Sequence, residues 1–259
     1  MSFSLENKRI IVTGGAQGIG EATVRAYARE GARVVSFDLN TDPGQQVADE
    51  ATAAGPGSVS FQTVDVADRA AVDSSVDEAV AELGGLDVLV NVAGLQRSAL
   101  AGDIADDLWE HIYRVNVLGT VHTNQAAFRH MKANAAGSIV NFGSMSGFVG
   151  ELGNAVYGSS KAAVHTWTRT VAKEWGPFGI TVNAVLPYVT TPMFDKYRSS
   201  LTADELAAYD AEIVRTVPLG RLGDADKDLA PVMVFLASEA SHFITGQLIP
   251  VDGGLAQVR

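Results

Sequence analysis

The sequence contains no cysteine among its 259 residues, so disulfide bonds, thiolate nucleophiles and cysteine-based zinc sites are excluded. Basic residues are also scarce, because 19 lysines and arginines stand against 30 aspartates and glutamates and leave a net charge of -11. Nucleic-acid binding depends on clustered cations that displace phosphate counterions, and the sequence shows no such cluster. We therefore expect no nucleic-acid partner, no metal site and a reducing, cytoplasmic location.

Long apolar runs are absent as well. No uninterrupted run approaches the roughly 20 residues that a membrane-spanning helix needs. The charges near the N-terminus lie next to an apolar run that is too short for a secretory signal. Hydrophobic residues nevertheless make up 47% of the chain and charged residues 19%, which is ample material for a core. The sequence predicts a soluble protein with no membrane partner.

Short apolar runs rich in β-branched residues alternate with segments of helical spacing. Each run is typical of a strand buried on both faces, as in parallel sheets. No linker or low-complexity segment interrupts the alternation, so we expect one doubly wound α/β domain over residues 1–259, with helices on both faces of a parallel sheet. The seven expected strands are residues 9–14, 32–38, 59–66, 86–94, 137–144, 179–187 and 247–254.

One region departs from this alternation. After Pro187 the chain inserts a long stretch of helix-like, partly polar sequence before the next expected strand. Insertions of this kind often act as lids over a site, although a plain surface excursion is the alternative. We expect a substrate lid at about residues 188–222.

A glycine-rich turn, TGGAQGIG at residues 13–20, follows the first expected strand and opens the first helix. Its glycines allow a sharp turn and close approach to a pyrophosphate, while the helix N-terminus faces the negative charge. Alone such a turn is a weak indication, but the second strand ends at Asp38, where a carboxylate can accept hydrogen bonds from ribose hydroxyls. We expect dinucleotide contacts from Gly14, Gln17, Gly18, Ile19, Gly20, Asp38 and Leu39.

Asp38 also predicts which dinucleotide is bound. A carboxylate repels the 2′-phosphate of NADP, and the neighbouring Ala16, Gln17 and Leu39 are not basic. These residues favour NAD. The alternative is that Asp38 is only a turn residue.

The segment AVYGSSKAA places Tyr157 and Lys161 one helical turn apart, so both side chains point the same way. Beside a bound cofactor the ammonium would stabilise a phenolate and lower the pKa of Tyr157, which would make it a usable general base. Ser144, at the end of an expected strand, could hold the substrate oxygen. A tyrosine and a lysine at this spacing are common by chance, so the pair gains meaning only together with Ser144 and the glycine turn.

In their order and spacing these motifs resemble the short-chain dehydrogenase/reductase family. The resemblance implies a Rossmann-type fold, a homotetramer, and reversible hydride exchange between a secondary alcohol and the nicotinamide of NAD. It runs from about Lys8 to Gly254 and rests on TGGAQGIG, NVAG at 91–94, Asn116 in RVNVLGT, Ser144, YGSSK at 157–161 and ITGQLIPVDGG at 244–254.

The resemblance assigns roles position by position. Tyr157 would transfer the proton, and Lys161 would lower its pKa and bind the nicotinamide ribose. Ser144 would orient the substrate oxygen, and Asn116 would support a water-mediated proton path from Lys161. For Asn91 and Asn116 a structural role as buried amides stays open beside the functional one. Further cofactor contacts are implied for Asp65, Val66, Asn91, Ala93, Gly94, Pro187, Val189 and Thr191.

Three positions depart from the family pattern. Val92 stands where the family usually has a second asparagine, and Gly143 stands where most relatives have a serine before the catalytic hydroxyl. Another hydroxyl follows at Ser146, but Ser144 keeps the usual distance to the catalytic tyrosine. The glycine that usually follows Pro187 is missing, which restricts the backbone there. We expect Tyr188 to turn toward the substrate instead.

The family topology also suggests the walls of the substrate site. Most of the expected residues are apolar, which favours a hydrophobic or cyclic alcohol or ketone as the small-molecule substrate. A 3-oxoacyl carrier-protein reductase or a sugar-alcohol dehydrogenase of the same family is the alternative, and a dinucleotide-binding regulator without turnover is a more remote one. The expected substrate contacts are Gln96, Ser144, Val149, Leu152, Tyr157, Tyr188, Met193 and Phe194.

Overall fold

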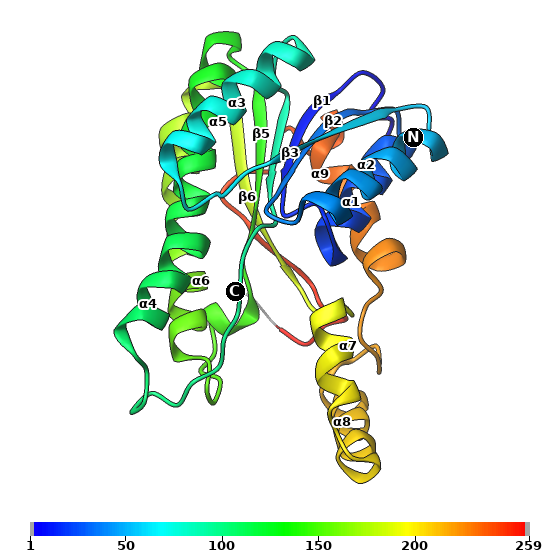
Figure 1. Cartoon of the computed structure of the whole chain (residues 1–259), viewed down its shortest axis with the longest axis vertical. Coiled ribbons are helices and arrows are strands. Elements are labelled where there is room, and N and C mark those ends of the chain that lie inside the picture. Colours follow the sequence, from blue (N-terminus) through cyan, green and yellow to red (C-terminus); the bar gives the residue numbers. More distant parts are fainter. Residues whose placement is uncertain (1–2, 257–259) are drawn as a thin grey trace.

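The computed structural model describes residues 3–256 and contains one sheet of seven parallel strands with helices on both faces (Figure 1). The predicted doubly wound architecture is confirmed. Each expected apolar run forms one strand, and the strands are β1 (Arg9–Thr13), β2 (Arg33–Asp38), β3 (Ser58–Thr63), β4 (Val88–Asn91), β5 (Gly137–Phe142), β6 (Ile180–Pro187) and β7 (Leu248–Val251).

The strand order is β3-β2-β1-β4-β5-β6-β7, so successive crossovers reverse direction between β1 and β4. In doubly wound sheets a ligand binds where the order reverses, outside the carboxyl ends of the strands. Five strands end earlier than expected, and for β3 and β4 the difference lies beside this reversal. Residues 64–66 and 92–94 leave the sheet at this edge instead of pairing with a neighbouring strand. β1 lies between β2 and β4 and pairs with both.

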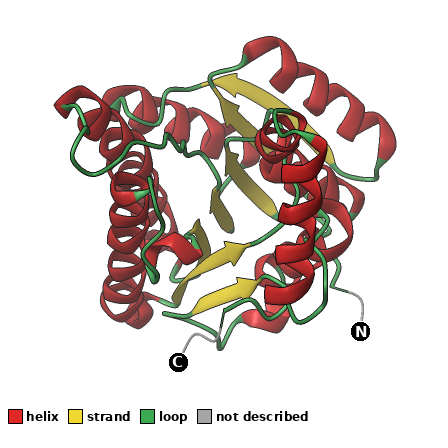
Figure 2. Cartoon of the chain, turned by 90° about the horizontal axis from the view of Figure 1, so that it is seen from below, coloured by secondary structure: helices red, strands yellow, loops and turns green. Residues whose placement is uncertain are grey.

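Helices cover both faces of the sheet because its apolar strands have no polar face (Figures 1 and 2). One layer packs around Tyr27 and Met233, and the other around Met131 and Trp175. The first layer consists of α1 (Gly18–Arg29), α2 (Thr41–Ala54) and α9 (Ala230–Ala237), and the second of α3 (Arg69–Leu83), α5 (Thr120–Asn134) and α6 (Ala155–Trp175).

The second layer contains a local irregularity that the sequence did not predict. The helical stretch over residues 106–134 consists of α4 (Asp106–Tyr113), a π-helical turn (Arg114–Gly119) and then α5. Asn116 lies within the π turn and is buried. Single π turns inside α-helices are frequent at functional sites. Short 3₁₀ or π turns also occur at Met145–Gly147, Gly176–Phe178, Ala225–Leu229 and Glu239–Ser241.

The inserted segment after β6 forms two helices, α7 (Pro192–Ser199) and α8 (Ala203–Thr216), which project from the lower end of the sheet in Figure 1. A capping box between Thr202 and Glu205 starts α8. An ion pair between Arg198 and Asp210 joins the two helices. The insertion is therefore a helical hairpin with its own internal contacts. Over residues 3–256, no helix combines the length and the apolar character needed to cross a membrane.

Candidate active site

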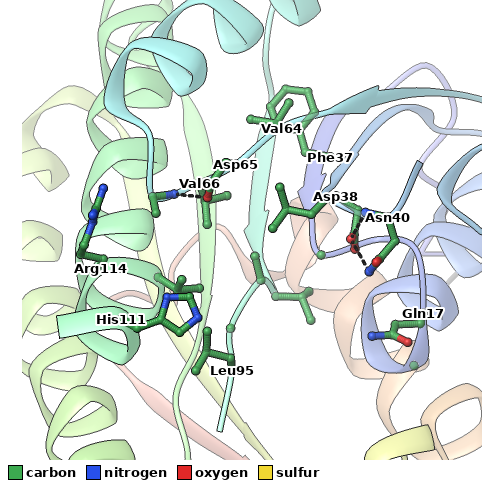
Figure 3. Close-up of a pocket in the computed structure, with 18 of the residues that line it drawn as sticks. Gln17, Phe37, Asp38, Asn40, Val64, Asp65, Val66, Leu95, His111 and Arg114 are labelled. Atoms are coloured by element: carbon green, nitrogen blue, oxygen red, sulfur yellow. Dashed lines mark hydrogen bonds between the residues drawn. The ribbon is translucent and has the colours of Figure 1, made fainter. Parts of the chain in front are cut away.

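A cavity of about 650 Å³ lies where the strand order reverses, and residues that follow four strands line it (Figure 3). They belong to the segments after β1, β2, β3 and β4. Residues of α4 and the π turn close the opposite side, and Thr191 and Pro192 at the start of α7 contribute to the wall. The expected residues found in this lining are Gly14, Gln17, Gly18, Ile19, Asp38, Leu39, Asp65, Val66, Ala93, Gly94 and Thr191.

Several lining residues carry no signal in the sequence. Five of them come from α4 and the π turn, which face the glycine turn, and only the tertiary structure brings those five to the cavity. The one motif near these helix residues is RVNVLGT, which contains Asn116 and begins at Arg114. The unexpected lining residues are Phe37, Asn40, Val64, Ala67, Val92, Leu95, Asp107, Glu110, His111, Arg114, Val115 and Pro192.

The glycine turn closes tightly against its surroundings. Gly14 has φ +73°, and a Cβ at this position would lie 2.7 Å from the backbone nitrogen of Ala93. A Cβ at Gly20 would lie 1.9 Å from the Gly14 carbonyl oxygen, so this glycine lets α1 begin directly against the turn. The first backbone N–H groups of a helix lack intrahelical acceptors and attract anions. The turn therefore has the geometry of a phosphate cradle.

Asp38 is held at the end of β2 by hydrogen bonds to both of its carboxylate oxygens. Oδ2 accepts from the backbone N–H of Ala16 at 3.1 Å, and Oδ1 accepts from the backbone and side-chain nitrogens of Asn40, each at 3.0 Å (Figure 3). These contacts fix the carboxylate beside the glycine turn. Asp38 is nevertheless part of the cavity lining. A ribose hydroxyl placed there would meet a preoriented acceptor.

The proposed catalytic side chains come together beyond the other end of the cavity. Lys161 is 6% exposed, and its Nζ donates to the Phe142 carbonyl at 2.8 Å. The same Nζ lies 5.8 Å from the centroid of the Tyr157 ring. Ser144 begins the short turn after β5, where its Oγ accepts from the Ser146 N–H at 3.2 Å.

Gly94 connects this cluster with the cavity. A Cβ at Gly94 would lie 3.2 Å from Oδ1 of Asn116 and 3.6 Å from Nζ of Lys161. Asn116 also hydrogen-bonds to the neighbouring Leu95 backbone and to Ser160 on α6. The end of the cavity therefore abuts two of the four expected catalytic residues.

In the protein without a cofactor, burial is the main influence on the pKa of Tyr157. Burial raises the pKa of its phenol above the ordinary value, hydrogen bonding with Ser144 works in the opposite direction, and the charge of Glu151 raises it further. The lowering by Lys161 that is expected beside a bound cofactor stays a prediction, and the Lys161 Nζ donates to the Phe142 carbonyl. Burial also lowers the pKa of Lys161, to about 8.

Asn91 lies outside the cavity lining, within a buried amide cluster. Its Nδ2 donates to Oδ1 of Asn141 at 2.9 Å, and its Oδ1 accepts from Thr123 Oγ1 at 2.6 Å. These bonds tie β4 to β5 and α5, which matches the structural role left open for this residue. Gly20, Pro187 and Val189 also lie outside the lining, and Val189 is buried against Gly223. Cofactor contacts from these four residues, like those from the residues in the lining, stay predictions.

A polar chain borders the expected substrate side of Ser144. Ser146 Oγ hydrogen-bonds to Ser144 Oγ at 3.3 Å and donates to the Glu151 carboxylate. That carboxylate also accepts from Asn154 Nδ2 at 2.9 Å, and Asn154 Oδ1 accepts from Gln96 Nε2 at 3.0 Å. Gln96 is thus joined to this chain, and its contact with substrate stays a prediction. Glu151 and Asn154 are additions that only the folded loop identifies.

The other expected substrate contacts are more dispersed. Val149 is 53% exposed and Leu152 is 92% exposed, whereas Tyr188 is half-buried. The Phe194 ring packs against Tyr209 of α8 at 5.8 Å between centroids. The side chain of Met193 lies outside what the structure describes. The roles of these five residues in binding substrate stay predictions.

Comparisons with known proteins agree with this arrangement. The chain is 37% identical over 252 residues to the 3-oxoacyl-acyl-carrier-protein reductase FabG of Thermotoga maritima, covering 97% of this chain and 98% of the relative. It is also 37% identical over 273 residues to the cyclohexanol dehydrogenase of Rhodococcus sp. (strain TK6), covering 98% of each. A solved gluconate 5-dehydrogenase from Burkholderia cenocepacia J2315, in complex with NADP and tartrate, superposes with a TM-score of 0.89 at 33% identity, over 98% of this chain and 96% of that one.

The profile of the short chain dehydrogenase family matches residues 8–202, which is most of the chain and includes the glycine turn, Asp38, Asn116, Ser144, Tyr157 and Lys161. The chain therefore belongs to the short-chain dehydrogenase family, whose members are oxidoreductases that bind a nicotinamide dinucleotide.

Proposed function

We propose that this protein is an NAD-dependent oxidoreductase that interconverts a hydrophobic or cyclic secondary alcohol and its ketone. One observation carries the proposal. The cavity that begins at the glycine turn and Asp38 ends at Gly94, where a Cβ would lie 3.2 Å from Asn116 and 3.6 Å from Lys161. The cavity therefore abuts Asn116 and Lys161, two of the four proposed catalytic residues.

The lining fits a dinucleotide. Gly14 packs closely against the Ala93 backbone, the N-terminus of α1 adjoins the turn, and Asp38 offers a fixed carboxylate. When bound, the nicotinamide would supply the hydride acceptor or donor. Gly14 and Gly18 would cradle the pyrophosphate, and Asp38 would accept from the adenosine ribose.

Tyr157 and Ser144 would perform the acid–base chemistry. During oxidation the Tyr157 phenolate would accept the proton of the substrate hydroxyl, while Ser144 Oγ holds the substrate oxygen by a hydrogen bond. Burial raises the pKa of Tyr157 in the protein alone and so disfavours the phenolate. A positive charge close to the phenol would be needed to lower this pKa during catalysis. Lys161, fixed by the Phe142 carbonyl, would bind the ribose and hold its charge near the phenol.

NAD is proposed over NADP because the Asp38 carboxylate lines the cavity beside the glycine turn and would repel a 2′-phosphate bound there. The Asp38 carboxylate is already fixed by Ala16 and Asn40, so moving it aside would break these bonds. Arg114 also lines the cavity, but from the helix that faces the glycine turn (Figure 3). We assign it no contact with the ribose phosphate.

The proposed substrate is a neutral alcohol, and similarity to the cyclohexanol dehydrogenase supports the cyclic class. The second candidate, reduction of a 3-oxoacyl group on a carrier protein, is favoured by the similarity to FabG. The net charge of -11 weighs against docking of an acidic carrier protein. A sugar alcohol is a third candidate, because the polar chain through Glu151 could bind hydroxyls.

The test is absorbance of the reduced nicotinamide during incubation with NAD or NADP and a panel of cyclohexanol, an aromatic secondary alcohol, xylitol and a 3-hydroxyacyl thioester. We expect turnover with NAD and cyclohexanol. Turnover confined to the thioester with NADP would establish the second candidate instead. Tight dinucleotide binding without turnover of any substrate would identify a regulator.

Three further expectations belong to this proposal. The hairpin of α7 and α8 begins at Thr191 and Pro192, which line the cavity, and this supports the proposal that it closes over a bound substrate as a lid. We also propose a homotetramer and a cytoplasmic location. Light scattering of the purified protein would determine the oligomeric state, and protease protection by dinucleotide and alcohol would report lid closure.

A further inference from the structure

His165 on α6 is buried, at 3% exposure, and lies against the turn that carries Ser144. The backbone N–H of Ser144 donates to Nε2 of His165 at 3.3 Å. Phe148 covers the imidazole, with 4.7 Å between the ring centroids. The imidazole therefore contacts the Ser144 segment directly, although it lies outside the acid–base chemistry proposed above.

Two glycines make room for this ring. A Cβ at Gly143 would lie 2.4 Å from Nε2 of His165, and a Cβ at Gly147 would lie 2.6 Å from Cε1. Contacts this short do not occur between real atoms, and both glycine positions flank Ser144. The departure at Gly143, where most relatives carry a serine, thus has a local explanation. A side chain there and the imidazole of His165 cannot both occupy this space.

The hydrogen bond requires a neutral imidazole. A protonated ring donates from both nitrogens and has no acceptor for an N–H group. Burial, with the nearby charges of Lys161 and Arg169, lowers the pKa of His165 to about 4. Both cations lie one helical turn away on α6. Near neutral pH, Nε2 is therefore available as the acceptor that the Ser144 N–H meets.

We propose that His165 is a positioning residue for Ser144, and that Gly143 is required because it admits the imidazole. The inference rests on the proposed role of Ser144. His165 fixes the backbone of Ser144, while the Ser146 N–H fixes its Oγ at 3.2 Å. Together these bonds set where the hydroxyl stands relative to Tyr157, and a misplacement of about 1 Å in such a group costs on the order of 100-fold in rate.

The first test compares two replacements of similar size. His165→Gln retains an oxygen acceptor at about the reach of Nε2, whereas His165→Met fills the space without a strong acceptor. We expect kcat with NAD and cyclohexanol to fall roughly 10- to 100-fold in His165→Met and to recover most of this loss in His165→Gln. Cofactor affinity, measured by NADH fluorescence, and the thermal unfolding midpoint should stay close to wild type in both.

The second test uses the steric coupling. Gly143→Ser alone should lower kcat by at least about tenfold, because the new side chain displaces the imidazole and the Ser144 backbone with it. The double variant Gly143→Ser/His165→Ala restores room for the serine. Its kcat should exceed that of Gly143→Ser, so that the two changes are non-additive.

Three results would overturn the inference. His165→Met could keep wild-type kcat, His165→Gln could lose as much activity as His165→Met, or kcat could fall only together with cofactor affinity and the unfolding midpoint. The last result would make His165 purely structural. Failure of the proposed function would look different, because wild-type protein would then show no alcohol turnover, or Ser144→Ala would retain full activity.

Discussion

Asn116 binds the backbone of Leu95 through both of its side-chain groups. The Leu95 N–H donates to Oδ1 at 2.8 Å, and Nδ2 donates to the Leu95 carbonyl at 2.9 Å. Nδ2 also donates to Ser160 Oγ at 3.0 Å, and that hydroxyl donates to the Tyr157 carbonyl at 2.7 Å. One amide in the π turn thereby connects the wall of the cavity with the helix that carries Tyr157.

Because of this connection, we expect Asn116→Ala to lose both stability and activity. Removing the amide leaves the Leu95 backbone groups without their partners, so the free energy of unfolding should fall by about 2 kcal/mol. kcat should fall by at least about tenfold, because the Tyr157 helix and the cavity wall lose their common anchor. Denaturant unfolding and alcohol oxidation measure the two effects. Asn134→Ala, at the exposed end of α5, is the matched control and should change neither.

Tyr157→Phe should abolish most turnover without loss of the cofactor site. General acid–base catalysis contributes about 10²- to 10⁴-fold, so we expect kcat to fall within that range while the NADH dissociation constant stays near wild type. The control is Tyr27→Phe, which removes a buried hydroxyl bonded to the Met233 carbonyl in the opposite helix layer. It should cost stability but leave kcat intact. Wild-type turnover in Tyr157→Phe would remove this residue from the chemistry.

Asp38→Asn should weaken the preference for NAD. The substitution removes the charge that excludes a 2′-phosphate and weakens acceptance from the ribose, so KM for NAD should rise about 10- to 100-fold and the ratio of NADP to NAD efficiency should increase. Steady-state kinetics with each cofactor measure this change. Asp42→Asn, on the exposed first turn of α2, is the charge-matched control. Equal effects of the two variants would contradict the assignment.

Glu151 should disfavour anionic substrates. Its carboxylate accepts from Ser146 and Asn154 beside the proposed substrate site and acts electrostatically on Tyr157. Glu151→Gln should therefore improve kcat/KM for 4-hydroxycyclohexanecarboxylate relative to cyclohexanol by about three- to tenfold, a modest factor because the group is exposed. Glu174→Gln, at the far end of α6, should leave the ratio unchanged. An unchanged ratio in Glu151→Gln would show that substrate binds elsewhere.

The low pKa of His165 predicts a loss of stability in acid. Between its ordinary value of 6.5 and about 4, the unfolded chain takes up a proton on this residue while the folded protein does not. The free energy of unfolding therefore falls as pH decreases through this window, by up to about 3 kcal/mol from this group. His165→Gln removes that contribution, so its stability should depend less on pH between 6.5 and 4. Parallel profiles for the two proteins, from urea unfolding, would contradict the burial effect.

Much of the fold was predictable because parallel strands have a local signature. Each of the seven runs is apolar and β-branched, and their alternation with helical segments leaves few topologies. The glycine turn and Asp38 were also predictable, since both lie at the ends of strands whose order the sequence pattern implies. The π turn around Asn116 was not, because a π turn depends on packing and hydrogen bonds from Leu95 and Ser160 and has no spacing of its own.

The candidate site also has a part that the sequence predicts and a part that it does not. The sequence by itself determined that Tyr157 and Lys161 share a helix face, because residue type and one-turn spacing decide this, and it predicts that they bear the chemistry. Only the tertiary structure decided their environment. Burial sets the direction of their pKa shifts, the Phe142 carbonyl takes one bond of the ammonium, and His165 occupies the space beside Gly143. Electrostatic and steric effects of this kind depend on distances between segments far apart in the chain, and a linear pattern does not contain those distances.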